Sequence, residues 1–192
     1  IAYISTSMMS ISPLVDTHLG YDTTKDILPL TTGLRGPNVL AVSAALPVRN
    51  LSELVAYAKA NPGKLNYGSI GNGSWHHLAT EKLLVALGIE ATHVPYKGET
   101  PAVSDLAAGV IQLMIVSGSA KAFLDEGKIV AIASTGSKPA KHAPKAQLIR
   151  DSGIAGVADY EEMPWIGFGM AAGAPADIVN KLHGALVKAL ES

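Results

Sequence analysis

Two turns rich in glycine and polar residues are the segments of this sequence best suited to binding chemistry. The first lies in residues 66–74, which read NYGSIGNGS, and the second in residues 93–98, which read HVPYKG. Each follows a short stretch typical of a β-strand and precedes a stretch with helical periodicity. Such a turn points free backbone N–H groups and the positive end of a helix dipole at the space above it, which stabilises an anion. The two turns predict a protein that holds a small acidic molecule, through a carboxylate or a phosphate.

Four residues of the first turn are candidates for contact with the bound group: Ser69, Asn72, Gly73 and Ser74. Helix capping alone explains Ser74, because a serine in this place accepts a hydrogen bond from the first turn of the helix with or without a ligand. The glycines and polar residues of the whole turn exceed what one cap requires. This excess favours a binding role.

Other candidates follow other strands. Lys97 stands between a strand end and Gly98, so an anion-binding role and the solvated position typical of a surface lysine both stay open. Ser117 ends a further apolar stretch and also lies at a strand end. Ser5 and Ser7 follow the first strand-like stretch and are candidates for another ligand-facing turn.

Alternating strand and helix patterns position these turns. The expected strands are residues 65–67, 91–96, 112–117 and 129–134, and the expected helices are residues 51–60, 74–87, 100–108 and 119–126. Asn50 and Glu53 have the spacing of a capping box, and Thr100 is the expected N-cap of the third helix. Strands and helices that alternate with short connections predict a parallel sheet covered on both faces, with ligands at the carboxyl ends of its strands.

Two further extended segments have a different expected role. Residues 39–43 and 164–170 are apolar and flanked by prolines, and we expect them to form a two-stranded connection to a second lobe. A helix that begins at Pro175 follows the second segment. Its apolar stripe needs a partner that the central unit does not obviously supply. The stripe consists of Ile178, Leu182, Leu186 and Leu190.

Composition excludes several classes of protein. Hydrophobic residues make up 48% of the 192 residues and charged residues 16%, which provides a core and shows no signature of disorder. The absence of cysteine excludes disulfides and thiolate catalysis. A net charge of −1 without a basic face argues against nucleic-acid binding, and no apolar run is long enough to span a bilayer. The sequence starts at Ile1 in a strand-like stretch, so we expect a fragment or a processed product whose lack of a signal peptide says nothing about localisation.

Motifs of common enzyme classes are missing. No serine lies in a G-x-S-x-G pattern, and the glycines of residues 71–73 lack the third glycine of a dinucleotide fingerprint. His77, Glu81 and His93 are an alternative as metal ligands, because His77 and Glu81 lie one helical turn apart. The alternative for His77 is a first-turn helix residue that hydrogen-bonds near the loop.

Taken together, these motifs resemble the receptors of tripartite tricarboxylate transporters, also called Bug solute-binding proteins. The resemblance is carried by residues 66–74 with the following HLA at residues 77–79, and by residues 93–98 with Pro101 and Asp105. It implies an α/β fold of the type II periplasmic binding protein class, with two lobes joined by two crossover strands. The second lobe, residues 40–163, is expected to be complete. Residues 1–36 and 167–192 are expected to form part of the first lobe.

The resemblance also implies a function. Receptors of this family are periplasmic, close over a carboxylated solute and pass it to a membrane permease. The implied contacts are backbone amides and hydroxyls of the turns named above, with Ser5 and Ser7 on the other lobe. No catalysis, cofactor, metal, nucleic acid or membrane insertion is expected. Many relatives carry an acidic or amide residue near the position of Ser117, where this sequence offers a hydroxyl. We therefore expect a ligand without an amino group, such as a mono- or dicarboxylate.

Three alternatives belong to other classes. The effector domain of a transcription regulator shares the lobe architecture, although the family motifs argue against it. A small metal-dependent enzyme would use His77, Glu81 and His93. A chain that binds no ligand would expose its lobe interface and dimerise through the apolar stripe of the last helix.

Overall fold

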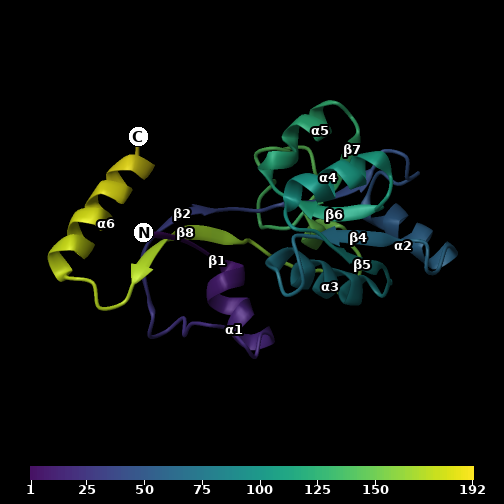
Figure 1. Cartoon of the computed structure of the whole chain (residues 1–192). Helices are drawn as coiled ribbons and strands as arrows, with labels where there is room; N and C mark the ends of the chain where they lie inside the picture. The colour runs from purple at the N-terminus through teal and green to yellow at the C-terminus, as the bar shows by residue number, and fades with distance from the viewer. The chain divides into compact units, whose positions relative to one another are not determined.

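The computed structural model describes all 192 residues and divides them into two compact units (Figure 1). Unit 1 consists of residues 1–35 and 164–192, and unit 2 consists of residues 36–163. The chain leaves unit 1 after β2 (Ile27–Arg35) and returns before β8 (Trp165–Ala171). The assignment of these units to ligand-binding lobes stays a prediction.

Unit 2 is built on a five-stranded sheet with strand order β5-β4-β6-β3-β7. The strands are β3 (Val39–Ser43), β4 (Asn66–Ser69), β5 (Thr92–Pro95), β6 (Leu113–Val116) and β7 (Ile129–Ser134). β4 is parallel to both β5 and β6, as predicted for the strands that carry the turns. β3 is antiparallel to β6 and to β7, so the sheet is mixed and the expectation of an all-parallel sheet is wrong.

The predicted role of residues 39–43 as a connecting strand is also wrong. β3 lies between β6 and β7, and all five of its residues are buried. A short apolar run is typical of any strand buried on both faces, so the sequence could not distinguish an interior strand from a connection. The flanking prolines lie outside the ladder, where a missing N–H removes no sheet hydrogen bond.

The helices of unit 2 include two whose caps the sequence identified. The helices of this unit are α2 (Leu51–Ala60), α3 (Trp75–Leu87), α4 (Glu99–Ala108) and α5 (Lys121–Asp125), with short 3₁₀ turns η2 (Gly118–Ala120) and η3 (Ile149–Asp151). The Asn50 cap of α2 is confirmed, because Glu53 N donates to Asn50 Oδ1 at 2.9 Å. The returning bond differs from that of a capping box, because Arg49 N, one residue before the cap, donates to Glu53 Oε2 at 2.7 Å. Ser74 caps α3, and its Oγ accepts from His77 N at 3.3 Å.

One predicted cap is wrong. α4 begins at Glu99 and its N-cap is Gly98, so Thr100 lies inside the first turn. Pro101 is tolerated there because the first N–H groups of a helix have no intrahelical partner. The earlier start brings Glu99 to the helix end, where its carboxylate lies close to the ends of the neighbouring strands.

The core of unit 2 fixes the strand that leads into the first turn. Tyr67, Met114 and Leu106 are fully buried, with α4 packed against the sheet. Gly68 lies so close to this packing that a Cβ atom on it would lie 2.5 Å from Ile111 Cδ1. Only a glycine fits this position without displacement of the core.

Unit 1 contains a three-stranded antiparallel sheet with strand order β1-β8-β2, in which β1 spans Ala2–Ser5. The π-helical turn η1 (Ser7–Ile11) and the short helix α1 (Ser12–Val15) follow β1. A Cβ atom on Gly167 would lie 2.4 Å from Thr31 O, so this glycine allows β8 to approach β2 closely.

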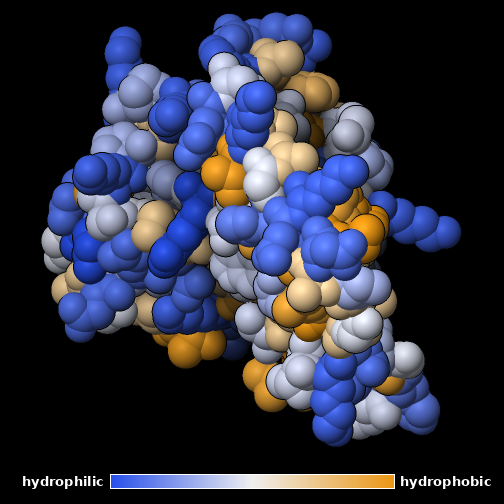
Figure 2. All heavy atoms as spheres, turned by 90° about the vertical axis from the view of Figure 1, so that its left-hand side faces the viewer, coloured by the Kyte–Doolittle hydropathy of each residue, from blue (hydrophilic) through white to orange (hydrophobic).

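The C-terminal helix α6 (Ala176–Leu190) packs against β2 and has no buried residue. A Cβ atom on Gly33 would lie 3.7 Å from Leu190 Cδ2, so the end of α6 lies near β2, but Ile178 and Leu190 stay 42% and 44% exposed. Figure 2, a view from the side of α6, shows hydrophobic atoms at the surface among hydrophilic ones. The stripe of this helix is only partly covered within its own unit.

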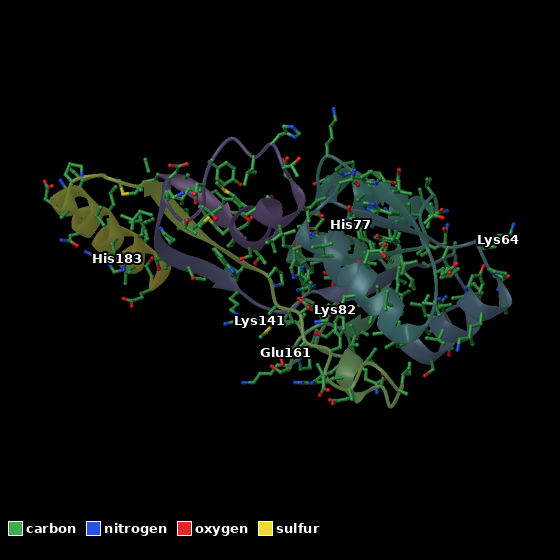
Figure 3. All side chains as sticks on the ribbon, turned by 90° about the horizontal axis from the view of Figure 1, so that it is seen from below. Lys64, His77, Lys82, Lys141, Glu161 and His183 are labelled. Carbon is green, nitrogen blue, oxygen red and sulfur yellow. The ribbon has the colours of Figure 1, made fainter.

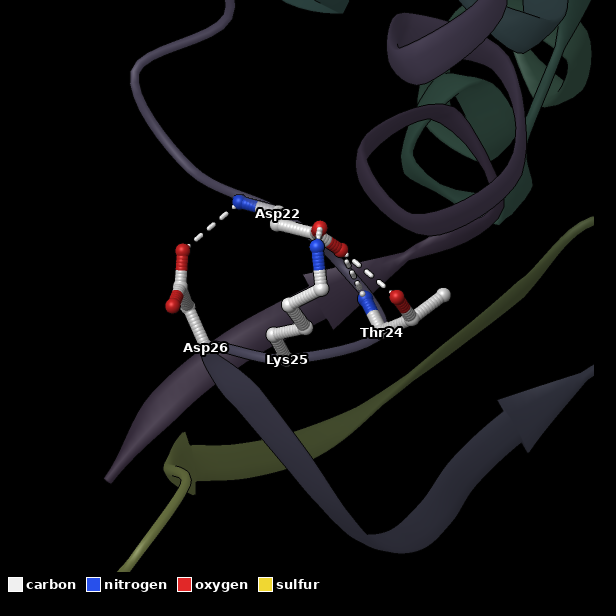
Figure 4. A network of polar contacts seen from close by, with 4 residues as sticks. All are labelled: Asp22, Thr24, Lys25 and Asp26. Carbon is white, nitrogen blue, oxygen red and sulfur yellow. Dashed lines mark hydrogen bonds and ion pairs between the residues drawn. The ribbon is translucent and has the colours of Figure 1, made fainter.

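The turn before β2 is held by a network of charged and polar groups (Figure 4). Asp22 Oδ1 accepts from Thr24 N at 2.9 Å, and Asp22 Oδ2 lies 2.8 Å from Lys25 Nζ. Asp26 Oδ2 accepts from Asp22 N at 2.7 Å. The hydrogen bond from Lys25 is the main reason that the pKa of Asp22 is well below its usual value.

Candidate functional site

The predicted turns of unit 2 meet at one edge of its sheet. β4, β5 and β6 are parallel, so the segments that follow them all lie at the carboxyl edge. The first two turns are joined directly, because Tyr96 N donates to Ser69 O at 2.9 Å. In Figure 3, Lys64, which precedes β4, and His77, which follows it, lie toward opposite ends of unit 2.

The first turn is folded around the hydroxyl of Ser69. Ser69 is fully buried, and its Oγ lies 3.1 Å from both the N and the O of Gly71 and 2.6 Å from His93 Nε2. Gly71 and Gly73 have φ values of 125° and 68°, which favour glycine. Ser69 thus organises the turn from within, whereas Asn72 is exposed on it.

Three rings form a stack beneath this turn. The His77 and His93 centroids lie 4.0 Å apart with planes inclined by 10°, and the Tyr67 and His93 centroids lie 4.9 Å apart. The Tyr67 hydroxyl donates to Glu81 Oε1. The lone pairs of an imidazole lie in its ring plane, so two rings stacked face to face cannot direct them at one ion. The chain contains no group of three histidine, cysteine or acidic residues placed to hold a metal ion, and the metal-site alternative is not supported.

The stack is connected to the turn by a backbone bond. Gly73 N donates to His77 Nδ1 at 3.2 Å, which requires a neutral His77 that carries its proton on Nε2. Burial is the main cause that lowers the pKa of His93, the proximity of His77 adds to this effect, and Glu81 opposes it. The Gly73 N–H, predicted as a donor to a ligand, therefore points at an imidazole in this structure.

The second turn carries an exposed lysine, and a hydrogen bond holds the residue that precedes it. Lys97 is exposed, and the preceding Tyr96 donates its hydroxyl proton to Asp105 Oδ2 at 2.8 Å. Partial burial, followed by this hydrogen bond, raises the pKa of Tyr96 to about 12. Gly98 follows as the N-cap of α4. A cation is thus available at the same edge as the first turn.

The third strand end already holds a carboxylate that belongs to the chain. Ser117 N donates to Glu99 Oε1 at 2.6 Å, and Ser117 Oγ donates to Glu99 Oε2 at 2.8 Å. Sequence reasoning missed Glu99, although its place in the first turn of the helix after β5 was a usable signal. The expectation that this position offers only a hydroxyl, and hence that the ligand lacks an amino group, loses its basis because an acidic group is present.

A buried and a half-buried imidazole near Glu99, those of His76 and His142, were also missed. His76 is 9% exposed, and neither of its ring nitrogens has a hydrogen-bond partner within the chain. Burial lowers the pKa of His76, and the charge of Glu99 opposes this effect. Burial likewise lowers the pKa of His142, whose Nε2 has no partner in the chain. Both rings are therefore held neutral next to the third strand end.

The two candidates of unit 1 lie on a different turn. Ser5 ends β1, and its Oγ accepts from Met8 N at 3.3 Å, while Ser7 begins η1. The structure thus brings seven of the nine candidates to one edge of unit 2 and places Ser5 and Ser7 in unit 1. Whether any of the nine contacts a ligand stays a prediction.

Comparison with known proteins decides the family. The sequence matches the model of the tripartite tricarboxylate transporter family receptor, TctC, over residues 1–192. The chain belongs to this family. The resemblance drawn from the two turns is confirmed, and membership in TctC disfavours the transcription-regulator alternative.

TctC relatives extend well beyond this chain. The UPF0065 protein in the tcbD-tcbE intergenic region of Pseudomonas sp. (strain P51) is 33% identical over 171 residues, which are 88% of this chain and 50% of that protein. Protein BugT of Bordetella pertussis is 28% identical over 173 residues, 90% of this chain and 52% of BugT. The chain spans about half the length of these curated relatives.

Solved TctC-like structures have the same fold. R. palustris Rpa4515 with adipate is 34% identical with a TM-score of 0.89, and covers 96% of this chain and 61% of its own. MatC (Rpa3494) from Rhodopseudomonas palustris with bound malate is 26% identical with a TM-score of 0.89, and covers 99% of this chain and 64% of its own. The predicted α/β fold of periplasmic binding proteins is confirmed.

Proposed function

We propose that this chain is part of an extracytoplasmic receptor that captures a small carboxylate, with the carboxyl edge of unit 2 as the binding surface. The observation that carries the proposal is the pair of hydrogen bonds from Ser117 to the Glu99 carboxylate, at 2.6 and 2.8 Å. An edge that binds a carboxylate of its own chain has the donors that a ligand carboxylate needs. The adipate of Rpa4515 and the malate of MatC support this ligand class.

The finer parts of the proposal are inferred from membership in the TctC family. The protein would act in the periplasm, where its relative BugD is described as a periplasmic binding protein, and deliver its ligand to permease subunits. A di-, tri- or aromatic carboxylate is the proposed ligand, without a cofactor and without catalysis. No helix of the chain combines the length and the apolar character needed to cross a membrane.

Energetics sets how many contacts the ligand must make. A charged group at one helix N-terminus gains about 0.3–1 kcal/mol, or about 2 kcal/mol when partly buried. Micromolar affinity requires about 8 kcal/mol. One turn is therefore insufficient, and the proposal requires the turns around Ser74 and Lys97 to act together.

Isothermal titration calorimetry with adipate, malate and adipamide tests the proposal. Adipamide has the length of adipate without its charges, so we expect heat of binding from a carboxylate and none from the diamide. Lys97→Gln should weaken carboxylate binding about fivefold, for a loss of about 1 kcal/mol. Lys64→Gln is the matched control, because Lys64 is also exposed but lies toward the other end of unit 2 (Figure 3). Equal effects of the two substitutions would contradict the assigned surface.

A further inference from the structure

The backbone donor at the centre of the first turn is occupied by a histidine. Gly73 N donates to His77 Nδ1 at 3.2 Å, so this N–H is already engaged by a side chain of its own chain. The same ring stacks on His93 at 4.0 Å, and His93 Nε2 lies 2.6 Å from the hydroxyl of Ser69. Two imidazoles from different elements thus control the donors of one turn.

We propose that the stacked His77–His93 pair couples carboxylate binding to proton uptake: the neutral pair sequesters the Gly73 N–H, and a proton on the pair releases it toward the ligand. The proposal rests on the proposed function, because it concerns the turn assigned to the ligand. It adds a proton as a second component of the binding reaction.

The hydrogen bonds fix what a proton does at His77. The Nδ1 atom must present a lone pair to accept from Gly73 N. A proton that binds Nδ1 converts the acceptor into a donor, and two donors cannot share the 3.2 Å contact. The Gly73 N–H is then free to bond an anion, next to a ring that carries a positive charge. Both changes favour a carboxylate.

A proton at His93 acts on the hydroxyl of the same turn. With Nε2 unprotonated, this atom accepts the Ser69 hydroxyl proton at 2.6 Å. With Nε2 protonated, the ring donates to Ser69 Oγ, and the hydroxyl proton turns to Gly71 O at 3.1 Å. The turn keeps these hydrogen bonds whether His93 is neutral or protonated, so its fold is retained when the ring becomes charged.

The surroundings of His93 favour its neutral form. The groups that face it are the Tyr67 ring, 4.9 Å from His93, and the carboxylate of Glu81, which binds the Tyr67 hydroxyl. Burial and the proximity of His77 lower the pKa of His93, and Glu81 only partly opposes them. Two charged rings at 4.0 Å repel each other, so the pair takes up one proton as a unit.

Reciprocity gives the expected measurement. If the ligand binds the protonated pair more tightly than the neutral pair, lower pH must strengthen ligand binding. Protonation of the pair then raises the ligand affinity by the same factor by which the bound ligand raises the proton affinity of the pair. A ligand that raises the pKa of the pair by about one unit binds about tenfold more tightly when the pair is charged. We expect adipate affinity to rise between pH 7.5 and 5.5, where adipate still carries charge, by a factor that has about ten as its upper limit.

Calorimetry of the wild-type chain with adipate, in two buffers of equal pH near 6.5 and different ionisation enthalpy, tests the coupling. We expect a buffer-dependent heat that corresponds to uptake of up to one proton. His77→Gln and His93→Gln should each reduce it, and His183→Gln should not, because His183 is an exposed residue of α6 in unit 1 (Figure 3). Equal heats in both buffers, or affinity that does not change with pH, would overturn the proposal.

A ligand-free experiment separates this inference from the proposed function. In ¹H–¹⁵N spectra of the wild-type chain, the Gly73 amide should move with pH in step with the His77 ring signals. A Gly73 amide that stays fixed while the His77 ring titrates would refute the release of the N–H, whatever ligand the protein binds. An amide that moves while no carboxylate produces heat would support the switch and contradict the proposed function.

Discussion

Removal of the Glu99 carboxylate should destabilise unit 2 and leave a vacancy that a free carboxylate can fill. Glu99 accepts two hydrogen bonds from Ser117, at 2.6 Å from the backbone N and 2.8 Å from Oγ. Glu99→Ala removes both acceptors, and Glu99→Gln keeps one of them in a neutral group. The two variants therefore form a graded series at one position.

The magnitude follows from the two bonds. A hydrogen bond to a charged group contributes about 1.5–3 kcal/mol when buried, and Glu99 and Ser117 are only half-buried. We therefore expect Glu99→Ala to lower the free energy of unfolding by about 2–3 kcal/mol, and Glu99→Gln by about 1–2 kcal/mol. Glu90→Ala is the matched control, because Glu90 is exposed and an exposed substitution changes stability by about 0.5 kcal/mol or less.

Urea unfolding with and without acetate is the assay. Acetate that binds the folded Glu99→Ala variant should restore about 1.4 kcal/mol at a concentration about ten times its Kd. Sodium chloride at equal ionic strength should restore nothing, and neither salt should act selectively on Glu90→Ala. A Glu99→Ala variant as stable as its control, or one that chloride restores as well as acetate, would refute the claim that this edge recognises carboxylates.

Three further predictions concern the fold that supports the site. Stability should fall as pH drops below about 6.5, because a lowered pKa in the folded chain means that the unfolded chain binds protons more readily. The residues concerned are His76, His93 and His142. Urea midpoints measured between pH 7.5 and 5 should show this loss, and a constant midpoint would be inconsistent with it. Gly68→Ala should cost about 1–3 kcal/mol, since its Cβ would lie 2.5 Å from Ile111 Cδ1, and an unchanged melting temperature would show that the core yields. Asn50→Ala should cost about 1 kcal/mol through the lost cap of α2, and a loss below about 0.3 kcal/mol would show that the cap is dispensable.

Local signals in the sequence were sufficient for much of the fold. Asn50 and Ser74 mark helix starts, and their side-chain bonds are local, so a short stretch of residues contains both partners. The strands before the two turns were identified for the same reason. β3 was misplaced because a buried apolar run does not specify its neighbours, and its antiparallel pairing with β6 joins residues far apart in the chain.

The site was harder to predict than the fold. The turns were identified from their own glycines, but the groups that occupy their donors come from other elements. Glu99 reaches Ser117 from the start of α4, and His93 reaches Ser69 from β5. These pairs form only once the strands are in register. Spacing alone therefore indicated where an anion could bind, but not which donors were already engaged.

A small carboxylate is proposed to bind at the carboxyl edge of the unit 2 sheet. Amide chemical-shift mapping of the chain during titration with adipate tests this most directly. We expect the largest shifts in residues 69–74 and 97–98, with smaller changes at Ser117. Shifts confined to unit 1, or none in these turns at adipate concentrations that produce binding heat, would contradict it.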